Sequence, residues 1–134
     1  MQAFRFLSAA LISLSFSAGF PALSAIASPE IASGDGLINA DIATCLDRTD
    51  AFVDTLNLSI ERGDIVRTGY FGDGSFRILC YPNPYDQSDP LATPSTGQSM
   101  VVVFAAHESD FDVADTFVRI ALSEIADPQV ASPQ

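Results

Sequence analysis

The first residue to consider for chemistry is His107, because it is the single histidine of the chain. It follows a short apolar run and precedes a predicted helix, and such loops often carry active-site residues. Both a general base and a metal ligand are hypotheses for its imidazole. A zinc site takes three or four protein ligands, however, and one histidine supplies little of that set. We name His107 and Asp110 as weak catalytic candidates of a small hydrolase or metal-dependent enzyme, and we expect a surface histidine, no metal and no cofactor.

Sequence motifs of the common enzyme classes are absent. There is no G-x-S-x-G nucleophile elbow. Nor is there a P-loop, and the glycines of Gly72-Asp73-Gly74 lie between two predicted strands rather than before a helix. Acidic residues are so numerous that no carboxylate pair stands out. The sequence therefore favours a protein without catalytic activity.

Residues 64–82, DIVRTGYFGDGSFRILCYP, give the strongest structural signal. Two β-prone runs flank Asp73-Gly74, a dipeptide typical of the type I′ turn of a hairpin. With these two residues as the loop, Phe71 faces Phe76 on one side of the hairpin and Tyr70 faces Arg77 on the other. We expect the first side, which also carries Cys80, to lie in the core.

The second side of the hairpin carries Tyr70, Arg77, Leu79 and Tyr81, a mixture of aromatic, aliphatic and cationic groups. Such a face is either covered by another element or left as a binding surface. An arginine held on a strand among aromatic side chains can bind an anionic group. The alternative is an ion pair with a nearby aspartate.

The connection 82–99 follows, with four prolines and no periodicity. A structureless segment of this length is commonly functional in a small domain, and we keep both a simple crossover and a binding loop as interpretations. Our candidate binding residues are Tyr70, Arg77, Tyr81, Arg67 and, from this loop, Tyr85.

The N-terminal residues 1–27 resemble a cleaved secretory signal. They contain one charge and an apolar run diluted by serines, and they end in Ala25-Ile26-Ala27, which fits the small-x-small rule for signal peptidase. Export favours a disulfide, and the two cysteines predict a single Cys45–Cys80 bridge. We therefore expect a periplasmic or extracellular protein with no membrane contact after cleavage.

The chain is acidic, with a net charge of −11 and no lysine. Such a surface repels phosphate backbones, so we expect no nucleic-acid partner. High external salt screens the repulsion among its carboxylates, which suits a salt-tolerant bacterium. The acidity also allows a cationic partner, but a solvated acidic surface is the simpler interpretation.

Hydrophobic spacing predicts the remaining elements. We expect helices over Asn39–Asn57 and Phe111–Ala126, the second capped by Ser109 or Asp110, and a buried strand over Met100–Ala106. Residues 28–38 are expected as a flexible lead-in and 128–134 as a disordered tail, leaving one domain over 39–127. The predicted fold is α+β, in the order α-β-β-β-α, with a three-stranded and mainly antiparallel sheet.

The segment GDGLINAD, residues 34–41, resembles the calcium loop of a dockerin repeat at Asp35, Gly36, Ile38 and Asn39. Ile31 stands where that loop has its first acidic ligand, Asp41 comes one position early, and there is no second repeat. We therefore expect Asn39 to cap the first helix instead.

From these observations we expect a small exported domain that binds a protein or a small molecule. The alternatives are the enzyme centred on His107 and an inhibitor or accessory subunit of an envelope enzyme. The oligomeric state stays open.

Overall fold

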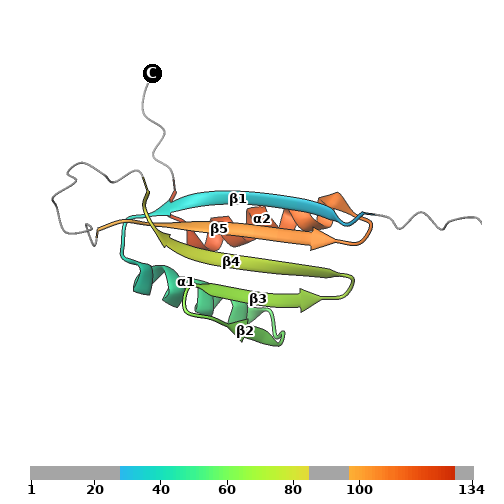
Figure 1. Cartoon of the computed structure of the whole chain (residues 1–134), viewed down its shortest axis with the longest axis horizontal. Helices are drawn as coiled ribbons and strands as arrows, with labels where there is room; N and C mark the ends of the chain where they lie inside the picture. The colour runs from blue at the N-terminus through green and yellow to red at the C-terminus, as the bar shows by residue number, and fades with distance from the viewer. Residues whose placement is uncertain (1–27, 85–96, 129–134) are drawn as a thin grey trace, which may run out of the picture.

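A computed structural model describes residues 28–84 and 97–128. Five strands and two helices make up this part of the chain (Figure 1). In chain order they are β1 (Glu30–Ile38), α1 (Ile42–Thr55), β2 (Ile60–Arg62), β3 (Val66–Phe71), β4 (Gly74–Pro82), β5 (Ser99–His107) and α2 (Phe111–Ile125).

The strands form one sheet in the order β1-β5-β4-β3-β2, and every neighbouring pair is antiparallel. Strands β2 to β5 follow one another as a meander, and β1 pairs with β5 at the far edge. Both helices pack on one face of this sheet (Figure 1). α2 contacts β1 and β5, and α1 contacts β4 and β5. No described element covers the other face.

The predicted α+β class is confirmed, but the predicted three-stranded sheet is wrong, since the sheet has five strands. The first additional strand, β1, occupies the segment expected as a flexible lead-in and resembling a calcium loop. The glycines of this strand allow α2 to pack closely against it. A Cβ on Gly36 would lie 2.5 Å from the Cβ of Ala126, and one on Gly34 would lie 2.8 Å from Leu122 Cδ1. The other additional strand, β2, has three residues and no periodicity to reveal it.

The hairpin of β3 and β4 is present, but its register differs from the prediction by two residues. Phe71 pairs with Gly74, so Gly72-Asp73 forms the two-residue loop instead of Asp73-Gly74. Within this loop, φ is positive at Gly72 and not at Asp73, which is the pattern of a type II′ turn rather than type I′. A shift of two residues keeps every side chain on its predicted face, because strand side chains alternate with period two.

Both predicted helices are present with shorter bounds. Asp41, rather than Asn39, caps α1, and its Oδ1 accepts a hydrogen bond from the backbone N–H of Thr44 at 2.9 Å. This bond, followed by one from the Thr44 hydroxyl, lowers the pKa of Asp41. Asp110 caps α2 as predicted, and its Oδ1 accepts from the N–H groups of Asp112 and Val113.

The core lies between the sheet and the helices. The predicted disulfide is confirmed: Cys45 of α1 is bonded to Cys80 of β4, with Cα atoms 6.0 Å apart, and both residues are fully buried. Phe117 of α2 packs its ring against Phe76 of β4 at 4.6 Å between centroids and against Phe52 of α1 at 6.0 Å. These contacts hold both helices to the same face of the sheet.

Some of the predictions fall on residues outside the described ranges. They are the signal sequence over 1–27, Tyr85 with most of the 82–99 connection, and the tail beyond residue 128. Among the described residues, no helix is long and apolar enough to cross a membrane.

Candidate functional site

The uncovered face of the sheet is apolar along its centre. On β5, side chains alternate between the core and this face, so that Met100, Val102, Phe104 and Ala106 point away from the helices. A strand with one face in water usually carries polar residues on that face. Phe104 is nevertheless 44% exposed, and the uncovered face holds two further large exposed side chains, Ile31 and Tyr70, at 60% each.

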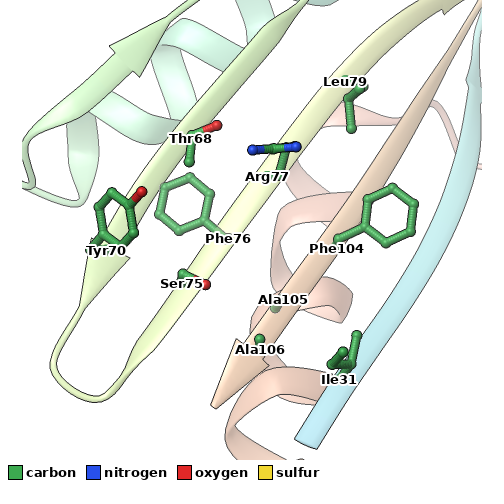
Figure 2. A pocket seen from close by; sticks show the side chains of 10 residues that line it. All are labelled: Ile31, Thr68, Tyr70, Ser75, Phe76, Arg77, Leu79, Phe104, Ala105 and Ala106. Atoms are coloured by element: carbon green, nitrogen blue, oxygen red, sulfur yellow. The ribbon is translucent and has the colours of Figure 1, made fainter. Parts of the chain in front are cut away.

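A hollow of about 450 Å³ lies on this face. The pairing of the strands explains it: Tyr70, Ser75, Ala106 and Ile31 form one row across β3, β4, β5 and β1. Small side chains occupy the two central positions of the row, and large ones stand at its two ends. The next row places Arg77 between Thr68 and Phe104, and Figure 2 shows these side chains around the hollow.

Arg77 forms no ion pair with any described residue, in contrast to the other arginines of that part of the chain. Arg48, Arg62, Arg67 and Arg119 each lie within 4 Å of an aspartate oxygen. Arg77 instead stands exposed beside the hollow, with the hydroxyl-bearing Thr68 directly opposite on β3. The nearest acidic position along its row is Glu61 of β2, beyond Thr68. A guanidinium in this setting is available to an anionic group from outside.

Arg67 lies on the covered face, away from the hollow, and is only 8% exposed. Its Nε and NH2 donate to the two carboxylate oxygens of Asp50 at 2.6 and 2.9 Å, and its NH1 donates to the carbonyls of Gly63 and Val66. The hydrogen bond from Arg67 is the main cause of a lowered pKa at Asp50. This candidate binding residue therefore joins β3 to α1.

The structure brings together two of the five candidate binding residues, Tyr70 and Arg77, at one hollow. Tyr81 shares their face but pairs with Met100 at the opposite end of β4. The ends of the 82–99 connection also lie there, where the N–H of Asn83 donates to the carbonyl of Gln98. Tyr85 itself lies outside the described residues.

Two residues at the hollow, Phe104 and Ile31, were not among the candidates predicted from the sequence. Phe104 belongs to an apolar run interpreted as a strand buried on both faces, and Ile31 to a segment interpreted as a lead-in. One signal was available for Phe104: in an antiparallel sheet, a strand that is apolar on both sides needs a cover on both sides. The sequence predicts two helices and a mainly antiparallel sheet, and no predicted element was assigned to pack against the second side of that strand.

The two catalytic candidates carry structural hydrogen bonds at the start of α2. Nδ1 of His107 accepts from the backbone N–H of Asp110 at 3.0 Å and of Ser109 at 3.3 Å, while Asp110 caps the helix. A neutral imidazole with its proton on Nε2 satisfies this geometry. Within residues 28–84 and 97–128, no group of three or more His, Cys, Asp or Glu is arranged to hold a metal ion.

Comparisons with known proteins found no matching family model, no matching curated protein and no matching solved structure.

Proposed function

We propose that this protein is an exported, non-catalytic binding module that takes its partner on the uncovered face of the sheet. The carrying observation is that Arg77, which has no ion-pair partner within residues 28–84 and 97–128, lies beside a hollow on a largely apolar face. Exposed apolar patches of this kind on a small protein often mark binding sites. The volume of about 450 Å³ lies within the usual range of ligand sites.

The charge at the centre of the uncovered face supports the proposal, because its sign is opposite to the net charge of the chain. The chain carries a net charge of −11, yet the centre of the uncovered face bears a cation that no described aspartate or glutamate neutralises. Even a paired surface charge contributes only about 0–1 kcal/mol to folding, so an exposed arginine without an acidic partner gains little for the fold. An external anionic group gives it a role that the fold does not.

The disulfide is consistent with export, because such bonds persist in oxidising compartments. It joins a helix to the central part of the sheet and leaves the uncovered face unobstructed. A rigid sheet with one free face is well suited to binding, since little ordering is required when a partner docks.

Selection of peptides from a random heptapeptide display library on the immobilised mature protein tests the proposal. We expect enriched peptides to shift the backbone amide resonances of β3, β4 and β5, and to lose at least tenfold in affinity for a Tyr70→Ala/Phe104→Ala variant. The control is Ile120→Ala, which removes a side chain 50% exposed on α2. Peptides that bind the double variant as tightly as the wild type would overturn the proposal, provided that both variants unfold at the wild-type temperature.

A further inference from the structure

A second hollow adjoins the first and gives the binding face a charge pattern. This hollow of about 380 Å³ is bordered by Asp73 and Glu108, and it shares Tyr70, Ser75 and Ala106 with the hollow beside Arg77. The two hollows therefore form one continuous surface along β4 and β5. We call this surface the β4–β5 groove.

The acidic end of the groove is fixed by the backbone. The N–H of Glu108 donates to the carbonyl of Asp73 at 3.0 Å, which holds the loop after β5 against the hairpin turn. Both side chains are exposed, and neither forms an ion pair with a described residue. The groove thus has two carboxylates at one end and the Arg77 guanidinium at the other.

The spacing of these charges matches an extended chain. Arg77 and Asp73 are four residues apart, with Ser75 midway on β4 and Asp73 in the loop just before the strand, and four residues of extended chain span roughly 13 Å at about 3.3 Å per residue. In an extended peptide, residues i, i+2 and i+4 point to one side and cover the same length. Over the small side chains of Ser75 and Ala106, there is room for an apolar side chain at i+2.

We propose that the occupant of the β4–β5 groove is an extended peptide segment of a partner protein with an acidic residue at i, an apolar residue at i+2 and a basic residue at i+4. The acid lies on Arg77, the apolar side chain enters the hollow between Tyr70 and Ile31, and the base lies against Asp73 and Glu108. This inference rests on the proposed function and adds the chemistry of the partner.

A second copy of this chain fits the groove less well. Two copies each bring a net charge of −11, and two facing concave surfaces would leave the hollows unfilled. Packing at protein interfaces normally matches the density of protein interiors, so an unfilled centre is unfavourable.

Three five-residue probes, acetylated and amidated to remove their terminal charges, test the inference. The first is Asp-Thr-Leu-Thr-Lys, the second Asp-Lys-Leu-Thr-Thr, in which the charges are adjacent, and the third the uncharged Asn-Thr-Leu-Thr-Gln. Titration at low ionic strength, followed by amide chemical shifts, gives each dissociation constant. We expect the first probe to bind roughly tenfold more tightly than the third and several-fold more tightly than the second, because each weak ion pair contributes up to about fivefold.

Paired substitutions assign each charge to its end of the groove. Arg77→Gln should abolish the preference for Asp-Thr-Leu-Thr-Lys over a fourth probe, Asn-Thr-Leu-Thr-Lys, which differs only at position i, whereas Arg119→Gln on α2 should leave that preference unchanged. Asp73→Asn with Glu108→Gln should abolish the preference for Lys at i+4, whereas Asp47→Asn on α1 should not. These controls separate groove contacts from the general attraction of a cation to an acidic protein.

Equal binding of the charged and uncharged probes at the groove would overturn this inference and leave the proposed function standing. Shifts confined to the helix side, or no shifts with any probe, would count against both. Sedimentation equilibrium tests whether the protein forms a dimer through the groove. A dimer that dissociates on the substitution Arg77→Gln would assign the groove to a second copy and would overturn the proposal of a peptide partner.

Discussion

Arg67 and Arg77 lie on neighbouring strands of one hairpin, but on opposite faces of the sheet. Arg67 is 8% exposed, and its guanidinium donates hydrogen bonds to Asp50 and to two backbone carbonyls. The guanidinium of Arg77 has no ion-pair partner among the described residues. From sequence the two were equivalent candidates for binding an anion. The position of the helices therefore decides whether an arginine of the hairpin stabilises the fold or remains available to a partner.

Breaking the disulfide that joins α1 to the covered face of the sheet should destabilise the protein most. Replacing both cysteines, Cys45→Ala with Cys80→Ala, removes a bridge across 35 positions of sequence. The chain-entropy estimate for such a loop is roughly 3.5–4 kcal/mol. We expect the free energy of unfolding, measured in urea, to fall by about this amount. A loss below about 1 kcal/mol would show that the helix packing, and not the bridge, holds α1 in place.

The direct test of the comparison replaces each arginine in turn. Arg67→Ala leaves the carboxylate of Asp50 without its main partner, and we expect a loss of about 2–3 kcal/mol, below the value for a fully buried pair because Asp50 is 31% exposed. Arg77→Ala should change stability by less than about 0.5 kcal/mol, as is usual for exposed residues. Equal losses in urea denaturation would remove the distinction between the two faces.

Substitutions at neighbouring positions of β1 compare the covered and the uncovered face within a single strand. Gly36→Ala places a methyl group 2.5 Å from Ala126 Cβ, which forces the end of α2 away from the sheet. Overpacking of this kind costs about 1–3 kcal/mol. Asp35→Ala, at the neighbouring position on the uncovered face, should be nearly neutral. A Gly36→Ala protein with the wild-type midpoint of thermal unfolding would mean that α2 approaches β1 less closely.

The smallest expected effect is on the pH dependence of stability. The pKa of Asp50 is lowered mainly by its hydrogen bond from Arg67, so the folded state binds this proton less readily than the unfolded state. The associated stabilisation is present above the unfolded pKa of about 3.9 and is lost as the pH falls through the lower folded value. The effect is smaller than that of Arg67→Ala, because protonation leaves both side chains in place.

Urea denaturation between about pH 5 and pH 2 measures this dependence. The wild type should lose stability more steeply than Arg67→Ala over that range. Asp41 and Asp127 also have lowered pKa values, from the backbone N–H groups of Thr44 and Asn39 first, and both remain in the two proteins. Parallel slopes would contradict the assignment of the Asp50 shift to Arg67.

Much of the fold follows from local patterns in the sequence. Three features were recognisable: the apolar stripe of α2 with its Asp110 cap, the hairpin and the disulfide. The first two depend on residues close together in the sequence, and two cysteines can pair within the chain in only one way. β1 was missed since its covered side is built from Ala32, Gly34, Gly36 and Ile38, and glycine gives no hydrophobic signal. Its pattern becomes understandable only when the close approach of α2 is known.

The candidate site was predictable only in part. Tyr70 and Arg77 were assigned to one face by the alternation of strand residues, and that assignment survived the error in register because the error was an even number of residues. Phe104 and Ile31 come from strands that are distant in sequence, and only the pairing of β5 with β4 and β1 brings them to the same hollow. No local pattern specifies that pairing.

Local patterns in the sequence were enough to assign the α+β class, the disulfide and the separation of hairpin side chains into two faces. The tertiary structure decided which face the helices cover, and hence that Arg67 is bound by Asp50 while Arg77 stands free of the described acidic residues. The physical reason is that side-chain alternation is local, whereas burial depends on where two helices pack after the chain has crossed from one edge of the sheet to the other.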